Sequence, residues 1–279
     1  MKGMKKHVSM PGLLKRVRSQ FEKIPEIRDP RSKISLADCL MSGLAVFGLK
    51  MPSLLEFDEH MEEELIQHNL KMLYQIEKAP CDTYLRERLD EVDPLLLRKP
   101  FNRVFAALQR QKILERFNYY GDHYLISLDG TGCFSSHKIH CESCCIKNHK
   151  DGSKTYYHQM LGAVLVHPDE KTVIPLAPEP ILKQDGYKKN DCERNAAKRL
   201  LEAIRREHPH LKMIIVEDAL YANAPHINLI KQLDMRYIIG VKPDDHAYLF
   251  EFIKAVKMQE EERDKVTTLI IILGMDINI

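Results

Sequence analysis

Two apolar runs each end in an aspartate, and these two carboxylates are the side chains best placed to do chemistry. Asp129 follows the run 124–128, and Asp218 follows the run 213–217. A carboxylate at the end of a buried strand is held by a rigid element yet faces solvent, where it can bind a hard metal ion. The pair therefore indicates a metal site able to act on phosphate, although for either residue alone a turn at the strand end is the better explanation.

A cluster of thiols lies between the two aspartates. Cys-x-x-Cys with a nearby histidine is a spacing that a tetrahedral zinc site can use. The expected ligands are Cys141, Cys144, Cys145 and His149. The alternative is an ordinary loop with free thiols, because no second Cys/His pair follows at a standard distance. Under both interpretations lysines make the loop basic, so that it could face a DNA backbone: Lys138, Lys147, Lys150 and Lys154.

The elements that must position these residues follow residue 120. Three strands are expected at 124–129, 156–166 and 171–176, the last two forming an antiparallel hairpin. A helix capped by Asn190 and ended by Pro209 comes next, with an apolar face of Ala196, Ala197, Leu200, Leu201 and Ile204. A strand at 213–217, a helix at 225–233, a strand at 237–241 and a helix at 247–257 follow. This order predicts an α/β sheet with a parallel half.

The first part of the chain has a helical pattern without strand signals. We expect helices at 36–47, capped by Ser35 and ended by Gly48, and at 53–71, 83–89 and 101–114. The predicted domains are therefore a helical region at 1–120 and a catalytic domain at 121–279. Four basic residues of the helical region either hold DNA or form the charged outer face of a packing domain: Arg86, Arg88, Arg98 and Lys99.

Composition is that of an ordinary globular protein of 279 residues, 44% hydrophobic and 29% charged. There is no run of about 18 uncharged apolar residues and no signal-peptide pattern, so we expect a cytoplasmic protein with mostly reduced cysteines. The net charge of +2 is unevenly spread. The first 21 residues carry no acid, and they form either a phosphate-binding segment or a solvated tail containing Lys2, Lys5, Lys6, Lys15, Arg16 and Arg18.

The order of elements is that of the ribonuclease H-like fold, and several segments resemble the DDE transposases of bacterial insertion sequences. The resemblance covers most of residues 80–255, and its Asp-Gly-Thr and Asp-Ala-Leu-Tyr-Ala segments are its most specific parts. The resembling segments are Leu128-Asp129-Gly130-Thr131, Tyr157-His158-Gln159, Val173-Ile174-Pro175-Leu176-Ala177-Pro178-Glu179, Lys189-Asn190-Asp191-Cys192-Glu193 and Asp218-Ala219-Leu220-Tyr221-Ala222.

This resemblance implies hydrolysis at a transposon end and attack of the freed 3′-hydroxyl on target DNA. Two Mg²⁺ or Mn²⁺ ions would be bridged by Asp129 and flanked by Asp218, as in two-metal phosphodiester chemistry. The implied partners are DNA ends, target DNA and a second copy of the chain as a homodimer. Lys242, which follows the last clear strand, is a further candidate for phosphate contact, with an ordinary surface lysine as the alternative.

The third acid of such a site is where the chain departs from the family pattern. The family places a glutamate on a late helix, and the acids available there are Glu251, Glu260, Glu261 and Glu262. None has a convincing motif, so we expect the third ligand to be missing from a chain truncated at its C-terminus. The apolar segment 267–279 fits a frameshift or premature stop, and the alternative is a genuine final strand.

Other residues have simpler explanations. His158 is expected to be a core histidine rather than one that faces metal ions. Glu179, Asp191 and Glu193 resemble family positions, but carboxylates near a helix start also interact well with its dipole. Three functions follow: a DNA strand transferase, a transposase remnant that binds DNA without cleaving it, and another ribonuclease H-like nuclease completed by Glu251.

Overall fold

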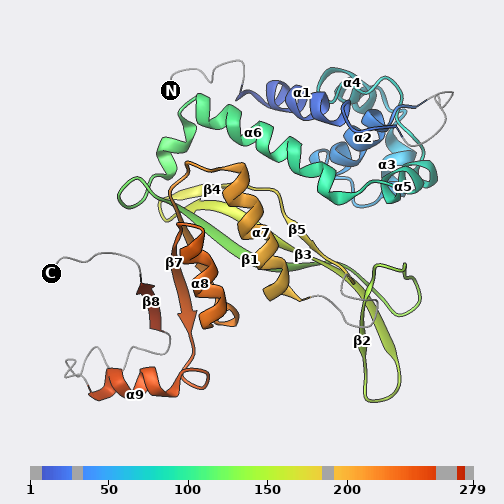
Figure 1. Cartoon of the computed structure of the whole chain (residues 1–279). Helices are drawn as coiled ribbons and strands as arrows, with labels where there is room; N and C mark the ends of the chain where they lie inside the picture. The colour runs from blue at the N-terminus through green and yellow to red at the C-terminus, as the bar shows by residue number, and fades with distance from the viewer. Residues whose placement is uncertain (1–7, 27–33, 184–191, 256–268, 274–279) are drawn as a thin grey trace. The chain divides into compact units, whose positions relative to one another are not determined.

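The computed structural model describes residues 8–26, 34–183, 192–255 and 269–273 (Figure 1). The chain forms two compact units, Met1–Glu115 and Arg116–Ile279. Within the described parts, no helix is both long enough and apolar enough to cross a bilayer.

The first unit is helical. Serine side chains cap three of its helices at Ser9, Ser35 and Ser53 by accepting backbone N–H groups, which confirms the predicted Ser35 cap. Its elements are α1 (Met10–Phe21), α2 (Leu36–Gly48), α3 (Leu54–His60), α4 (Glu64–Met72), α5 (Asp82–Asp90), η2 (Pro94–Leu97) and α6 (Arg98–Arg110), followed by η3 (Ile113–Phe117).

The single helix expected at 53–71 is wrong, because the chain forms α3 and α4 with a break between them. Three consecutive glutamates begin at Glu62, and in one continuous helix Glu59 would face Glu62 and Glu63 at the three- and four-residue spacings where like charges repel. At the break, Glu63 and Glu64 lie at the start of α4, where the helix dipole favours negative charge. The acids therefore favour a new helix start over continuation.

The core of the first unit surrounds α2 and includes Met41, Phe57 and Tyr74. Gly48 is the last residue of α2, and the left-handed residue after the helix is Lys50, with φ 58°. A Cβ on Gly48 would collide with the Tyr74 hydroxyl. Gly48 therefore provides room for close packing, whereas the sequence had suggested that it ends the helix.

Arg88 belongs to this core, with a side chain only 1% exposed, and it is ion-paired with Glu26 and Glu91. The option that Arg88 holds DNA is therefore wrong, because its guanidinium neutralises two glutamates of its own chain. Arg86 and Lys99 are exposed.

The second unit is built on a mixed sheet with the strand order β2-β3-β1-β6-β7-β8, and β4 and β5 also pair with β3. Strands β1 and β6 and strands β6 and β7 are parallel, whereas β3 and β8 run antiparallel to their neighbours β1 and β7. The strands are β1 (Tyr124–Ser136), β2 (Cys145–Asn148), β3 (Lys154–His167), β4 (Glu170–Pro175), β5 (Glu179–Ile181), β6 (Met213–Glu217), β7 (Arg236–Val241) and β8 (Leu269–Leu273).

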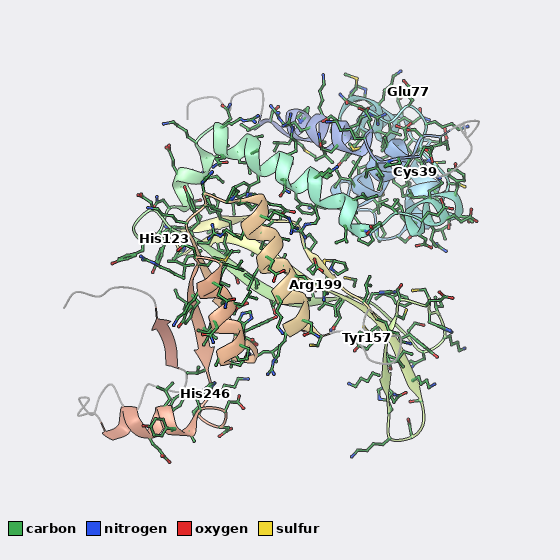
Figure 2. The ribbon with its side chains drawn as sticks, viewed as in Figure 1. Cys39, Glu77, His123, Tyr157, Arg199 and His246 are labelled. Carbon is green, nitrogen blue, oxygen red and sulfur yellow. The ribbon has the colours of Figure 1, made fainter. Side chains whose placement is uncertain are left out.

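Helices α7 (Glu193–Glu207) and α8 (Ala224–Gln232) pack against each other, α7 also against β3 and β5, and α8 against β7 (Figure 1). The five apolar residues predicted for one face of α7 are all buried. The guanidinium of Arg199 on α7 donates to Glu179 of β5 at 2.7 Å, which fixes the helix to the sheet (Figure 2 labels Arg199). The second unit has the predicted ribonuclease H-like fold.

The structure differs from the predicted strands in the length of two strands, in two additional short strands and in a final strand. β1 and β3 are longer than expected, and the short strands β2 and β5 had no sequence signal. The segment 269–273 within the apolar tail pairs antiparallel with β7, as in the alternative of a final strand. Helix α9 (Ala247–Ala255) matches the expected helix start at residue 247.

Candidate active site where the pairing of β1 and β6 ends

The pairing of β1 with β6 sets the two aspartates side by side. Ser127 and Val216 form the last pair of the parallel register, so Asp129 and Asp218 each lie two residues beyond the end of this pairing. Paired strands are about 4.8 Å apart, and residues two apart along a strand share a face. Both aspartates are exposed, whereas the intervening Leu128 and Glu217 are buried. The two carboxylates therefore lie together at the solvent-facing place where the pairing of β1 and β6 ends, here called the carboxylate edge.

The local structure around the two aspartates differs. Asp218 directly follows β6, and its Oδ1 accepts the backbone N–H of Leu220 at 3.0 Å, which caps the turn η4 (Ala219–Tyr221). Asp129 does not end its strand, because β1 continues to Ser136 in pairing with β3. It lies where β1 loses β6 as a neighbour, and its carboxylate is accessible for that reason.

A third carboxylate reaches this edge from the start of α7. Glu193 is the first residue of that helix, and its side chain lies over Gly130, where a Cβ would collide with the carboxylate carbon and both oxygens. Burial, and then the charges of Asp129 and Asp218, raise the pKa of Glu193 above its usual value. The structure thus brings three acids into electrostatic contact.

The sequence predicts only a helix-start role for Glu193 and places the third acid after Asp218 or nowhere, whereas the structure brings Glu193 to both aspartates. Glu251 lies exposed on α9, and Glu260, Glu261 and Glu262 lie outside the described residues, as does Asp191. The glycine that follows Asp129 is the sequence signal for Glu193, because it leaves space for a second side chain beside the first.

Two buried polar side chains lie next to Asp218. Oε2 of Glu217 is hydrogen-bonded to Nε2 of His226 at 2.7 Å, and both side chains are almost completely buried. Burial raises the pKa of Glu217, and the contact with His226 opposes this. The contact ties α8 to the residue that precedes Asp218.

Tyr221 adds a hydroxyl to the same neighbourhood. Burial, followed by the charge of Glu193, raises the pKa of its phenol, which therefore stays protonated. The Tyr221 hydroxyl lies near Glu193 and lowers the pKa of that carboxyl, against the effect of burial. The two groups do not meet the geometry of a hydrogen bond. Among the described residues this buried hydroxyl has no hydrogen-bond partner, so it can serve a ligand or water at the edge.

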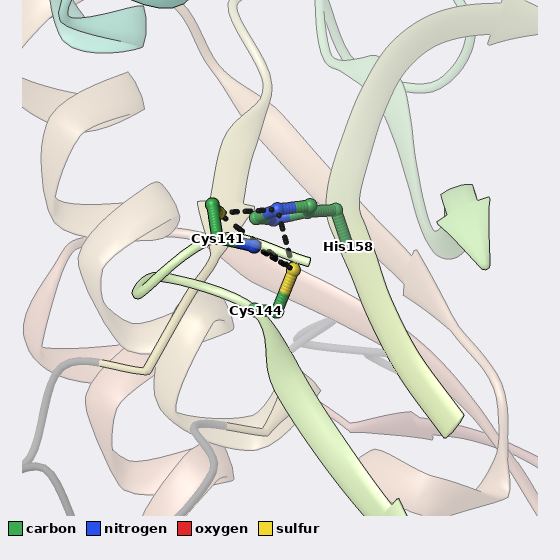
Figure 3. A group of neighbouring side chains, drawn as sticks. All are labelled: Cys141, Cys144 and His158. Carbon is green, nitrogen blue, oxygen red and sulfur yellow. Dashed lines mark hydrogen bonds between the residues drawn. The ribbon is translucent and has the colours of Figure 1, made fainter. Parts of the chain in front are cut away.

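The thiol cluster takes a different form from the one predicted. Cys141 and Cys144 meet His158 of β3, and among the described residues this is the one group of metal-binding side chains whose ligand atoms all lie within 4.8 Å of one another (Figure 3). Cys145 is buried with its thiol directed to the carbonyl of Ile181, and His149 contacts the hydroxyl of Thr155 at 2.7 Å. The predicted ligands Cys145 and His149 thus lie outside this group, whereas His158, expected in the core, is half-buried and contacts both thiols.

The basic residues expected to contact DNA have mixed surroundings. Lys5 and Lys6 lie outside the described residues, whereas Lys15, Lys138 and Lys242 are exposed. Lys242 follows β7 two residues beyond Gly240, which is level with Asp218 in the register of β6 and β7. The exposed Lys15, Lys138 and Lys242 remain candidates for contact with DNA phosphates.

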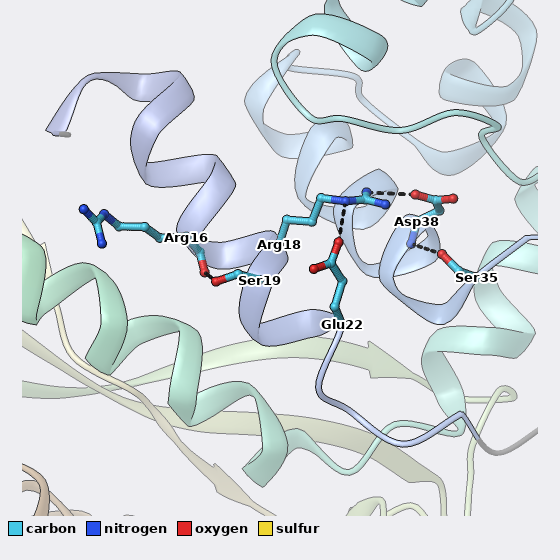
Figure 4. Close-up of polar contacts among 6 residues, drawn as sticks. All are labelled: Arg16, Arg18, Ser19, Glu22, Ser35 and Asp38. Atoms are coloured by element: carbon cyan, nitrogen blue, oxygen red, sulfur yellow. Dashed lines mark hydrogen bonds and ion pairs between the residues drawn. The ribbon is translucent and has the colours of Figure 1, made fainter. Parts of the chain in front are cut away.

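The two arginines of α1 are less available. The guanidinium of Arg18 donates to Glu22 at 3.1 Å and to Asp38 at 2.8 Å, while Arg16 points away from these acids (Figure 4). Arg16 is partly buried. Arg18 therefore joins α1 to α2, and its predicted role in DNA binding is replaced by this structural one.

No family model matches the chain, and no curated protein matches it. One similar solved structure is a piggyBac transposase in a synaptic complex with hairpin DNA, with a TM-score of 0.38 and 14% sequence identity. The alignment covers 90% of this chain and 54% of that chain, so this protein spans about half the length of the transposase chain.

Proposed function

We propose that this chain is a metal-dependent DNA-processing enzyme of the transposase type, which hydrolyses a phosphodiester at a transposon end and transfers the strand to target DNA. The observation that carries the proposal is that Asp129 and Asp218 each lie two residues beyond the last pair of β1 and β6 and that both carboxylates act electrostatically on Glu193. Glu193 completes a group of three acids. The segments around both aspartates resemble those of DDE transposases, which supports DNA as the substrate.

The three carboxylates suit hard divalent cations. Mg²⁺ prefers oxygen ligands and keeps several waters. Two-metal phosphodiester chemistry uses two such ions about 3.5–4 Å apart, held by carboxylates.

Asp129 is near both other acids, since Asp218 directly follows the neighbouring strand β6 and Glu193 lies over Gly130. Asp129 would therefore contact both ion positions, with Asp218 and Glu193 at the flanks. When bound, the ions would hold the attacking and leaving oxygens of an in-line displacement at phosphorus. The buried pair of Glu217 and His226 would keep the end of β6, and with it Asp218, in a fixed place.

The experiment is a nicking assay on supercoiled plasmid DNA with Mg²⁺ or Mn²⁺. We expect nicking by the full chain, and its loss in Asp129→Asn, Asp218→Asn and Glu193→Gln. Two exposed acids serve as matched controls: Asp169→Asn in the β3–β4 turn and Glu202→Gln on α7 should nick like the parent chain.

Two results would overturn the proposal. Salt-dependent DNA binding without any metal-dependent nicking would assign the chain to the DNA-binding remnants. Nicking that survives Glu193→Gln but is lost in Glu251→Gln would place the third acid on α9, as in the alternative of another ribonuclease H-like nuclease.

A further inference from the structure

Three side chains that are distant from the carboxylates converge on one point. Nε2 of His158 lies 3.2 Å from Sγ of Cys141 and 3.2 Å from Sγ of Cys144, and the two sulfurs are 3.7 Å apart (Figure 3). One imidazole nitrogen has a single proton or a single lone pair, so it cannot make a good hydrogen bond to both sulfurs at once. The equal distances instead indicate a shared ligand between the three atoms.

The dimensions of this triangle match those of a zinc site. With Zn–S bonds of about 2.3 Å and Zn–N bonds of about 2.05 Å, tetrahedral angles place two sulfurs about 3.8 Å apart and a sulfur and a nitrogen about 3.6 Å apart. The sulfur–sulfur separation of 3.7 Å agrees with the first value, and the nitrogen–sulfur separations of 3.2 Å are slightly shorter than the second. A Zn²⁺ ion would need only small side-chain shifts to enter.

The backbone holds both cysteines in place. Cys144 N–H donates to the carbonyl of Cys141 at 3.2 Å, which closes a tight turn, and Cys141 N–H donates to Sγ of Cys144 at 3.3 Å. A backbone N–H directed at sulfur stabilises a thiolate, the form that binds zinc. Lys183 N–H also donates to the carbonyl of Ser143 at 3.3 Å, so the turn is fastened to the chain after β5.

We propose that Cys141, Cys144 and His158 bind a structural Zn²⁺ ion, with water in the fourth position. The ion joins the loop before β2 to the middle of β3. Beyond it the sheet continues as a hairpin, here called the basic arm, made of residues 145–157 with β2 and the start of β3 (Figure 1). Three lysines of the basic arm are exposed: Lys147, Lys150 and Lys154.

The ion would lie at the base of the basic arm. Tyr157, the neighbour of His158, pairs with Cys145, the neighbour of Cys144 (Figure 2 labels Tyr157). Cys144 and His158 are therefore the chain neighbours of two residues that pair with each other across β2 and β3. The third ligand, Cys141, lies in the loop that leads into β2. The ion therefore fixes the direction in which the basic arm and its lysines leave the sheet.

A disulfide between Cys141 and Cys144 is the competing use of these thiols. It would bring the sulfurs to about 2.05 Å and leave His158 without a role. Metal analysis and mass measurement of the same sample distinguish the two, since a disulfide lowers the mass of the chain by two hydrogens and excludes zinc.

The test uses the full chain purified without chelator. We expect about one zinc ion per chain, and, after removal of zinc and addition of Co²⁺, the absorption of a tetrahedral ion with thiolate ligands. Cys141→Ser, Cys144→Ser and His158→Gln should each lose most of the zinc. Cys133→Ser, which removes an exposed thiol from β1, is the matched control and should keep it.

A second measurement covers variants that fold poorly. Chelation of zinc from the unmodified chain should speed backbone hydrogen exchange in residues 145–157, with little change in α7, and added zinc should reverse the effect. A chain that binds neither zinc nor Co²⁺, a Cys141–Cys144 disulfide in reducing buffer, or zinc retained in both cysteine variants would overturn the proposal. Exchange in 145–157 that is unchanged by chelation would overturn the stiffening role.

Discussion

Replacing Gly130 by alanine should disable the carboxylate edge while leaving the fold almost intact. The added methyl group would overlap the carboxylate of Glu193, whose side chain is half-buried and can rotate away. An off-rotamer side chain costs about 0.5–1.5 kcal/mol. For a unit of this size, 1 kcal/mol shifts Tm by about 2–4 °C. The melting temperature without metal should therefore fall by no more than about 6 °C.

The effect on metal binding should be larger. At a free Mg²⁺ concentration about 100 times Kd, binding adds about 2.7 kcal/mol to the free energy of unfolding. Displacing Glu193 should weaken binding at least tenfold, the lower limit for losing even an outer partner of a metal site. Since a factor of ten is worth about 1.4 kcal/mol, about half of the stabilisation by Mg²⁺ should be lost in Gly130→Ala.

The assay is a pair of thermal melts, with and without Mg²⁺, together with plasmid nicking. Gly132→Ala is a matched control in the same strand, because a Cβ there meets no atom within 4 Å. In a double-mutant cycle, Gly130→Ala should add nothing to the loss caused by Glu193→Ala, since both changes remove the same carboxylate. Equal Mg²⁺ stabilisation in the Gly130 and Gly132 variants, or additive losses in the cycle, would refute the reasoning.

Three further predictions concern the helical unit. Arg88→Met should lower the free energy of unfolding by about 1–3 kcal/mol, because Glu26 and Glu91, each about one-third exposed, lose their buried cation, whereas the exposed Arg86→Met should change it by less than about 0.5 kcal/mol; urea denaturation checks both. Ser35→Ala should cost about 1 kcal/mol in the same assay through loss of the α2 cap, and an unchanged midpoint would contradict the cap. Hydrogen bonds to Glu63 and then Glu56 raise the pKa of His60, so its small contribution to stability should be present below about pH 6.5 and fade as pH rises through the raised pKa; an NMR titration in which Glu63→Gln leaves that pKa unchanged would rule this out.

Periodicity predicted the long elements because burial depends directly on it. The apolar face of α7 and the buried strands β6 and β7 follow from spacing alone, since each element packs one stripe or face against the core. The strands β2 and β5, with four and three residues, are too short to show a period. They form because the long neighbour β3 offers backbone partners to them.

Residues joined only by the fold escaped prediction. His158 is 14 residues from Cys144, and an antiparallel pairing with no sequence signal brings them together. Glu193 precedes Asp218 in the chain but reaches the same edge, because α7 begins beside Gly130. Both predictions assumed that the order along the chain decides which residues meet: Cys-x-x-Cys with a nearby histidine for the zinc site, and a late glutamate for the third acid. In the structure, the sheet register decides which side chains meet.

The position of Glu193 makes the electrostatics of the edge informative. The first residue of a helix is where the dipole and free N–H groups favour an ionised carboxylate, which lowers its pKa. The pKa of Glu193 is nevertheless raised, by burial and then by Asp129 and Asp218. The aspartates and the loss of solvent thus outweigh the helix start, and among the described residues no cation offsets their effect on the pKa of Glu193. A structural carboxylate gains nothing from such surroundings, whereas a divalent cation would reverse the balance and let all three acids ionise together.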